Sequence, residues 1–279
     1  MSEMNEEKIA TLKQIIRQYE SVAVAFSGGV DSSLLLALSV EVLGRDQVVA
    51  LIGSSPTYPA RERERAITFC EHVGVEYHIL ETNEIGDARY RENDPLRCYY
   101  CKCHLFDDAL RFARERGVAV VVEGSNADDS SDYRPGRRAT SERDIKSPLL
   151  EAGFTKKEIR EISKELGLAT HDLPAKACLA SRIPYGTAID ERILQKIDRA
   201  EGFLESLGLG QVRVRYHGDI ARIEVDPIEF GRLLEARESI VDRLKEIGFT
   251  YIALDLSGYR TGSMNEKLGL KPSPPPGNR

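Results

Sequence analysis

A segment rich in glycine and serine, Ser27–Ser33 (SGGVDSS), lies between two apolar runs near the start of the chain. Gly28 and Gly29 would let the backbone approach an anion closely, and the N–H groups of a following helix would point at that anion. The hydroxyl groups of Ser27 and Ser32 would add hydrogen-bond donors. This composition predicts a phosphate-binding loop. A strand-to-helix turn that simply needs small residues is the structural alternative.

One residue of this loop, Asp31, is negatively charged. A carboxylate beside a phosphate site is favourable when Mg²⁺ lies between the two groups, so we expect Asp31 to act through magnesium. The loop has neither the Gly-Lys-Ser/Thr of a Walker A motif nor the GxGxxG of a dinucleotide-binding fold. The positive charge that a phosphate site needs must therefore come from elsewhere in the chain.

The chain has five cysteines, an odd number that in a reducing compartment indicates metal, cluster or catalytic chemistry before disulfides. Cys98 and Cys101 are separated by two residues, a spacing that suits either a metal chelate or a redox pair. With Cys178 they make three thiolates, which could hold a 4Fe–4S cluster and leave one iron open. We expect Cys70 to pack in the core and Cys103 to be structural.

Residues 211–217 (QVRVRYH) alternate between apolar and polar side chains, as in a strand with one buried face. The alternation places Arg213, Arg215 and His217 on one face and turns Val212 and Val214 toward a core. A solvated sheet face is at least as well supported by this pattern as a ligand site.

Elements able to position these residues follow from the apolar periodicity. Short apolar strands at 21–26, 48–53, 75–80 and 118–124 alternate with helical patterns at 5–20, from Leu34 to about 44, 59–72 and 102–116, and a capping box at Thr155 starts a helix that runs to about 166. Alternation of apolar strands with helices predicts an α/β domain with a doubly wound parallel sheet.

A change of pattern after residue 185 predicts a second, smaller domain. A helix at 190–207, strands at 211–217 and 220–226 joined as a hairpin through Gly218-Asp219, a helix at 227–247 and a strand at 250–256 together indicate an α+β fold. We therefore expect domains at 1–185 and 186–270, the second for substrate binding or oligomerisation, and a disordered tail at 271–279.

Composition excludes several classes of protein. With 39 Lys and Arg against 45 Asp and Glu, the net charge is −6, which disfavours a general nucleic-acid binder. No apolar run approaches the roughly 18 residues that a membrane helix needs, and the acidic N-terminus is unlike a signal peptide. We expect a cytoplasmic protein with no membrane and no nucleic-acid partner.

The loop SGGVDSS resembles the signature of the PP-loop ATP pyrophosphatases, which cleave ATP between the α- and β-phosphates. Residues 123–129 (EGSNADD) resemble the second nucleotide segment of that superfamily, and they follow a strand, where α/β proteins bind ligands. The resemblance implies that Gly124 and Asn126 contact the nucleotide and that Asp128 or Asp129 holds Mg²⁺. Capping of the next element is the alternative for either aspartate.

Together with RCYYCK (97–102), CLASRIPYG (178–186) and LDLSGYRTGSMN (254–265), these motifs resemble LarE-type sulfur transferases over nearly the whole chain. The resemblance implies that a carboxylate of a pyridinium-biscarboxylate mononucleotide is adenylated and that sulfur displaces AMP, leaving a thiocarboxylate. It further implies a homo-oligomer, a hexamer in this family. An amide-forming synthetase, a tRNA thiolase and a nucleotide-binding regulator with a structural metal are the alternatives.

Two sulfur chemistries occur among proteins of this type. In one, a single cysteine gives up its own sulfur, and in the other a three-cysteine cluster passes on an extra sulfide from a separate sulfide donor. Cys98, Cys101 and Cys178 resemble the cluster version, and Cys178 is the sacrificial candidate if no cluster forms.

The same resemblance implies roles for four polar residues and one further weak candidate. Ser181 and Arg182 would contact the nucleotide, with a surface salt bridge as the alternative for the arginine. Arg213 and Arg215 would bind the phosphate of the substrate. Glu201 is a weaker candidate for metal or substrate contact, and an exposed helix charge is its stronger alternative.

Overall fold

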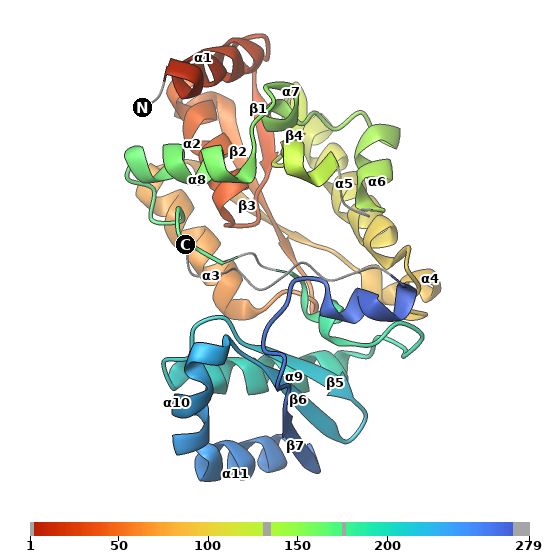
Figure 1. Cartoon of the computed structure of the whole chain (residues 1–279). Coiled ribbons are helices and arrows are strands. Elements are labelled where there is room, and N and C mark those ends of the chain that lie inside the picture. Colours follow the sequence, from red (N-terminus) through yellow and green to blue (C-terminus); the bar gives the residue numbers. More distant parts are fainter. Residues whose placement is uncertain (1–2, 131–134, 175–176, 270–279) are drawn as a thin grey trace. The chain divides into compact units, whose positions relative to one another are not determined.

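The computed structural model describes residues 3–130, 135–174 and 177–269. Contacts group these residues into two compact units, one formed by residues up to 87 with 96–174 and the other by 88–95 with 177–269 (Figure 1). The domain division expected at residue 185 stays a prediction, and in the structure residues 177–185 belong to the smaller unit. The tail expected at 271–279 lies outside the described residues.

A four-stranded parallel sheet forms the centre of the larger unit. Its order is β3-β2-β1-β4, and all neighbours run in the same direction. The strands are β1 (Val22–Ala25), β2 (Val48–Ser54), β3 (Glu76–Glu81) and β4 (Val120–Glu123). This confirms the α/β doubly wound sheet, with each strand within two residues of its expected position.

Helices cover both faces of this sheet, because the strands are apolar on both sides. Alternate residues of β1 and β2 pack on α1 (Glu3–Arg17), α2 (Val30–Leu43), α3 (Ala60–Val73) and α8 (Lys156–Glu165). The other residues of these strands pack on α5 (Arg97–Arg116), which lies on the opposite side of the sheet in Figure 1. The remaining helices of this unit are α6 (Gly136–Glu142) and α7 (Pro148–Glu151).

Helix α5 begins five residues before its expected start at residue 102. Leu96 occupies the cap position, so the Ser, Thr, Asp or Asn that usually signals a helix start is missing. The consequence is that Cys98 and Cys101 lie on the first turns of a helix.

The smaller unit has a three-stranded sheet of order β5-β6-β7. Strands β5 (Arg213–His217) and β6 (Ile220–Glu224) pair antiparallel, which confirms the hairpin, and β7 (Tyr251–Leu254) pairs parallel to β6. Its apolar core lies between the sheet, α9 (Glu191–Ser206) and α11 (Arg237–Ile247).

The single helix expected at 227–247 is wrong in detail, since the chain forms a 3₁₀ turn at Pro227–Glu229, α10 (Phe230–Glu235) and α11, with a break at Ala236. The short helix α4 (Ala88–Arg91) also belongs to this unit. No helix in the described ranges is both long and apolar enough to cross a membrane.

Candidate active site

The phosphate-loop candidate lies at the carboxyl end of β1, a central strand, and leads into α2. Gly29 stands at the cap position of α2 and has no side chain to accept the N–H groups of the first turn. Gly28 has a φ of 69°, and a Cβ there would lie 3.1 Å from the Cβ of Ala66. Ser27 and Ser32 face each other, with 3.2 Å between their hydroxyl oxygens. The loop therefore has the glycine conformation and the open helix terminus of an anion site.

Asp31 lies on the first turn of α2 and has two side-chain partners from distant parts of the chain. The amide nitrogen of Asn126 donates to one carboxylate oxygen over 3.3 Å, and the ammonium group of Lys156 pairs with the other. Lys156 is the first residue of α8, directly after the capping-box residue Thr155. No local pattern in the sequence indicated this contact of Lys156, and its position just after a helix cap was the available signal.

The segment after β4 packs tightly against the phosphate loop. A Cβ on Gly124 would lie 3.0 Å from the backbone nitrogen of Ser32, so only glycine fits there without movement. Asp128 accepts the backbone N–H of Lys156 over 2.8 Å, and Asp129 accepts the backbone N–H of Asn126 over 3.1 Å. Both aspartates therefore fix, by hydrogen bonds, backbone groups that lie next to the phosphate loop.

A second lysine reaches the same end of the sheet. Lys102, next to Cys101 on α5, pairs with Glu123 at the end of β4 over 3.2 Å. Burial alone would raise the pKa of Glu123, but Lys102 and hydrogen bonds from Ser125 and Ser147 lower it below its ordinary value. Glu123 is therefore a buried carboxylate that stays charged.

The cysteines of the larger unit have different environments. Cys98 is exposed and Cys101 half-buried, and their spacing puts them on one face of α5, where Cβ atoms three residues apart lie about 5–6 Å from each other. Burial raises the pKa of Cys70 to about 12, which confirms its place in the core, and burial also raises the pKa of Cys103. Within the described ranges, no three His, Cys, Asp or Glu side chains gather as a metal site.

In the smaller unit, Cys178 precedes a 3₁₀ helix, Leu179–Arg182, that is tied to α9. Arg182 donates two hydrogen bonds of 2.9 Å to Glu201 and a third, of 3.0 Å, to the backbone oxygen of Cys178. The side chains of Arg182 and Glu201 are 3% and 1% exposed. The exposed charge favoured for Glu201 and the surface salt bridge considered for Arg182 are both wrong, because this ion pair is buried.

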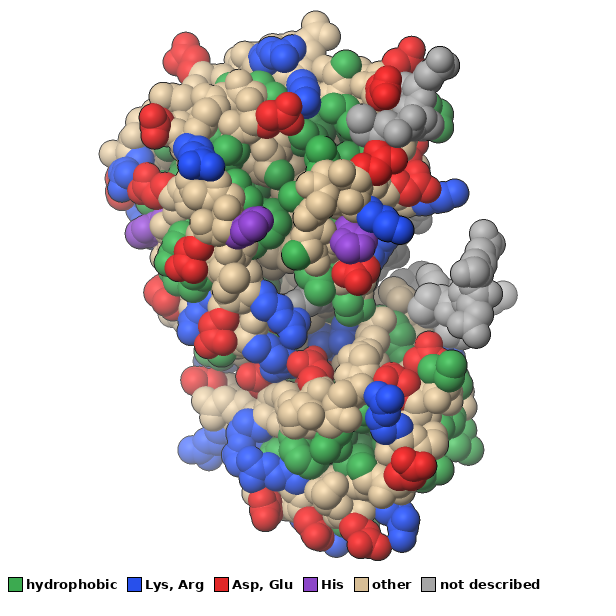
Figure 2. All heavy atoms as spheres, turned by 90° about the vertical axis from the view of Figure 1, so that its left-hand side faces the viewer, with side chains coloured by type: hydrophobic (Ala, Val, Ile, Leu, Met, Phe, Trp, Pro, Cys, Tyr) green, Lys and Arg blue, Asp and Glu red, His purple; other side chains and the backbone are tan. Residues whose placement is uncertain are grey.

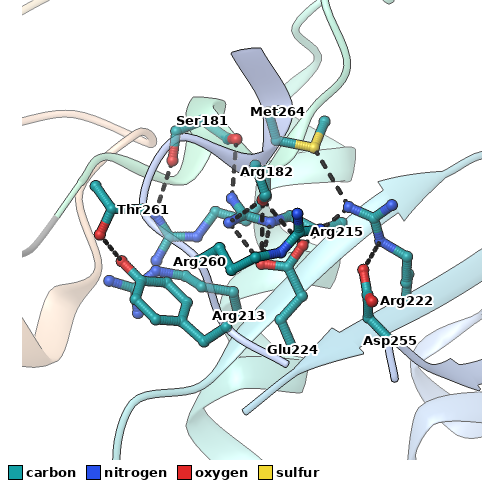
Figure 3. A network of polar contacts seen from close by, with 12 residues as sticks. Ser181, Arg182, Arg213, Arg215, Arg222, Glu224, Asp255, Arg260, Thr261 and Met264 are labelled. Carbon is teal, nitrogen blue, oxygen red and sulfur yellow. Dashed lines mark hydrogen bonds and ion pairs between the residues drawn. The ribbon is translucent and has the colours of Figure 1, made fainter. Parts of the chain in front are cut away.

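Arg213 and Arg215 are also buried, so the solvated sheet face is wrong at these two positions. Arg215 donates two hydrogen bonds to Glu224, of 3.0 and 2.7 Å, and one of 3.2 Å to the backbone oxygen of Ser181 (Figure 3). Arg222 pairs with the other oxygen of Glu224 over 2.9 Å. The register explains the cluster, since Arg215 stands opposite Arg222 in the hairpin.

The guanidinium of Arg213 lies 5.4 Å from the ring centroid of Tyr259 and donates to the backbone oxygen of Val212. Burial and the neighbouring charge of Arg182 lower the pKa of Arg213. Figure 3 shows these arginine side chains converging with Arg260 near Ser181. Glu201 and Glu224 balance the charges of Arg182 and Arg215, and Arg213 adds a further positive charge that would attract an anion.

On the face drawn in Figure 2, acidic and basic side chains are interspersed over each of the two units. Such mixing is typical of a solvated surface, whereas proteins that bind nucleic-acid backbones gather basic residues on one face.

Comparisons with known proteins found relatives whose similarity to this chain extends over both units. The family model described as NAD synthase matches residues 4–124. The chain is 37% identical over 261 residues to the pyridinium-3,5-bisthiocarboxylic acid mononucleotide synthase of Lactiplantibacillus plantarum. The aligned region covers 94% of this chain and 95% of the synthase. An uncharacterized protein of Synechocystis sp. is 39% identical over 95% of this chain and 99% of its own length. An NH(3)-dependent NAD(+) synthetase of Methanopyrus kandleri is 41% identical over 31% of this chain and 28% of its own length.

Proposed function

Because this chain belongs to the LarE-type sulfur transferases, ATP-using enzymes of the PP-loop superfamily, we propose that it converts a carboxylate of pyridinium-3,5-biscarboxylic acid mononucleotide into a thiocarboxylate. The observation that carries the proposal is the similarity to the Lactiplantibacillus synthase, since it spans both the phosphate loop of the larger unit and the arginine cluster of the smaller one. Cytoplasmic location and a homo-oligomeric state remain part of this proposal.

ATP would bind at the carboxyl end of β1. The loop 27–33 would hold the pyrophosphate part through backbone N–H groups and the serine hydroxyls, with Asn126 and the backbone at Gly124 beside it. The donor set fits Mg²⁺, because Asp31 offers a carboxylate next to the loop and magnesium in nucleotide sites commonly takes one or two carboxylates plus phosphate oxygens. Bound magnesium would neutralise the charge of the leaving pyrophosphate.

The order of steps follows from leaving-group chemistry. A carboxylate oxygen leaves poorly, so an oxygen of the substrate carboxylate attacks the α-phosphorus and the bond to pyrophosphate breaks. Sulfur then attacks the carboxyl carbon of the acyl adenylate, and AMP leaves with the former carboxylate oxygen. The chain's own residues bind and orient the reacting groups and hold the separated charges.

The phosphate of the mononucleotide substrate would bind at Arg213 and Arg215. Burial first and the charge of Arg182 second lower the pKa of Arg213, and an added anion beside its guanidinium would offset both effects. Ser181 would contribute through its hydroxyl, which accepts from Arg182 over 3.0 Å, and Glu201 would keep Arg182 oriented.

Sulfur would come from a 4Fe–4S cluster held by Cys98, Cys101 and Cys178, a finer proposal that rests on the sequence and on the shared helix face of the first two cysteines. When bound, such a cluster with an open iron supplies a site for an extra sulfide. The second version of the proposal is that Cys178 donates its own sulfur.

Iron and acid-labile sulfide, measured on protein purified without oxygen, separate the two versions. About four irons per chain, lost in Cys98→Ser, Cys101→Ser and Cys178→Ser but kept in the control Cys103→Ser, is the result expected for the cluster. Iron-free protein that transfers sulfur and loses about 34 Da, the mass of H₂S, would assign the sulfur to Cys178. If the Cys178→Ala variant releases pyrophosphate at the normal rate and forms an amide, the protein is not a sulfur transferase.

A further inference from the structure

The chain segment that precedes Cys178 is fastened to α8 by one arginine. Arg160 of α8 donates a hydrogen bond of 2.8 Å to the backbone oxygen of His171 and one of 2.7 Å to that of Leu173, and these two bonds form the Arg160 clamp. We propose that Arg160 is a positioning residue for sulfur transfer, because the clamp limits where Cys178 can lie when the activated carboxyl group forms. The inference rests on the proposed function, since it concerns the second step of that reaction.

The two acceptors belong to a stretch of chain without a regular hydrogen-bond pattern of its own. Residues 167–174 form turns and irregular chain, with neither helix nor strand. Backbone oxygens in such a stretch need other donors. The guanidinium of Arg160 is planar and presents its N–H groups as a rigid fork, so it holds both carbonyl groups at once. Arg160 therefore fixes the direction of the chain over residues 171–173.

Local contacts make this stretch compact enough for two hydrogen bonds to hold it. The backbone N–H of His171 donates to the oxygen of Leu168 over 3.1 Å, and that of Leu173 donates to the oxygen of Thr170 over 3.2 Å. Leu168 packs against the apolar core of the larger unit. The stretch thus begins at a core contact and ends at the Arg160 clamp.

Helix α8 connects the Arg160 clamp with the ATP site. Lys156, the first residue of α8, pairs with Asp31 beside the phosphate loop. Arg160 lies four residues further along, so its side chain leaves the same face of the helix about 6 Å along the axis. A single helical turn therefore separates the residue that contacts Asp31 from the residue that holds the chain before Cys178.

The length of chain between the clamp and the cysteine is short. Cys178 follows Leu173 by five residues, which span about 18 Å at most when fully extended. On the other side, Arg182 donates to the backbone oxygen of Cys178 over 3.0 Å. Along the chain, Cys178 is therefore flanked by two arginine anchors. Loss of Arg160 would widen the volume that this cysteine samples, and a small misplacement of a reacting group can cost about a hundredfold in rate.

Lys164 provides a matched control on the same helix. It lies four residues beyond Arg160, on the same face of α8, and it is exposed. Substitution of Arg160 or of Lys164 by methionine removes one positive charge from α8 in either case. A difference between the two variants therefore reports on the clamp and not on the charge of the helix. Arg160→Lys is a second variant that keeps the charge and loses the planar fork.

Hydrogen exchange, measured by mass spectrometry on the full chain, tests whether the clamp restrains the segment. Arg160→Met should speed exchange of the backbone amides of residues 168–173 by about tenfold, the effect of losing one hydrogen bond to a charged group. Lys164→Met should exchange these amides at the wild-type rate. Unchanged exchange in Arg160→Met would show that the two hydrogen bonds do not hold the segment, and the proposal would be wrong.

Rapid-quench single turnovers test what the clamp does in the reaction. Protein purified without oxygen and supplied with sodium sulfide is mixed with Mg–ATP and pyridinium-3,5-biscarboxylic acid mononucleotide, and pyrophosphate and thiocarboxylate are measured separately. We expect Arg160→Met to slow thiocarboxylate formation by about 10- to 100-fold, to release pyrophosphate within about twofold of the wild-type rate and to accumulate the acyl adenylate. Arg160→Lys should lie between this variant and the wild type, and Lys164→Met should match the wild type.

The outcomes separate this inference from the function it rests on. Equal slowing of pyrophosphate release and thiocarboxylate formation in Arg160→Met would assign Arg160 to support of the ATP site and overturn the proposal. Normal thiocarboxylate formation despite faster hydrogen exchange would also overturn it, because the clamp would then be structural only. A wild type that releases no pyrophosphate, or releases it without forming a thiocarboxylate, would contradict the proposed function and this inference with it.

Discussion

At the scale of single residues, the ATP site depends on how closely two backbone segments approach. Gly124 directly follows β4, and a Cβ added there would lie 3.0 Å from the nitrogen of Ser32 and 3.3 Å from the Cβ of Asp31. Either the phosphate loop or the 123–129 segment must then move by a few tenths of an ångström. A loop that binds phosphate through fixed N–H groups is sensitive to such a shift.

Gly124→Ala should therefore weaken ATP binding while leaving the fold intact. We expect a loss of about tenfold in ATP affinity and about 1–3 kcal/mol in the free energy of unfolding, the usual cost of overpacking. Gly231→Ala is the control, because a Cβ at this position in α10 meets nothing within 4 Å. Calorimetric titration with ATP and a urea melt of each variant check the prediction, and equal ATP affinity in both variants would contradict it.

At the scale of elements, the capping box fixes the first turn of α8 and so the position of the Lys156 backbone. The hydroxyl of Thr155 accepts the N–H of Glu158, whose carboxylate accepts the N–H of Thr155 over 2.8 Å. Thr155→Ala should cost about 1 kcal/mol of unfolding free energy, as is typical for a lost cap, and should weaken pyrophosphate binding as well.

Thr68→Ala is the control for this element. Its hydroxyl bonds to the backbone oxygen of Glu64 on the exposed side of α3, and it caps no helix. Thermal melts and pyrophosphate titrations of the two variants should differ in both measurements. Stability loss without any change in pyrophosphate affinity would show that the cap supports α8 but does not set the position of its lysine.

The secondary-structure elements also show which features of the fold the sequence could predict. The strands of both sheets, the hairpin at Gly218 and the capping box at Thr155 followed from local periodicity and turn chemistry, because those features act within a few residues. The start of α5 did not, since Leu96 at its cap carries no local signal. The pairing of Asp31 with Lys156, 125 residues away, depends on the fold and has no local pattern.

The arginines of β5 are a second case in which a local pattern predicted only part of the structure. Alternation along the strand placed Arg213 and Arg215 on one face, and that part is confirmed because Val212 and Val214 pack in the apolar core on the other. Period-two alternation cannot tell a solvated face from a buried polar cluster. The difference came from Glu224 on the partner strand and from Ser181 and its neighbours, which cover the arginines.

At the scale of the whole molecule, each unit has its own apolar core, so each is expected to unfold with its own transition. The smaller unit includes residues 88–95 from a distant part of the chain. Asn93, fully buried, joins this segment to the Cys178 region, because its amide donates to the backbone oxygens of Pro184 and Thr187 over 2.9 and 2.8 Å.

Asn93→Ala should lower the free energy of unfolding of the smaller unit by about 2–3 kcal/mol, because the buried carbonyl of Pro184 and the half-buried carbonyl of Thr187 lose their donor. Saturating ATP should increase the free energy of unfolding of the larger unit alone, by about 2.7 kcal/mol at an ATP concentration of a hundred times Kd. Differential scanning calorimetry of wild type and variant, with and without Mg–ATP, measures both shifts. A single transition that moves with both changes would mean that the two units unfold as one cooperative body, and the segment 88–95 would then stabilise the entire molecule.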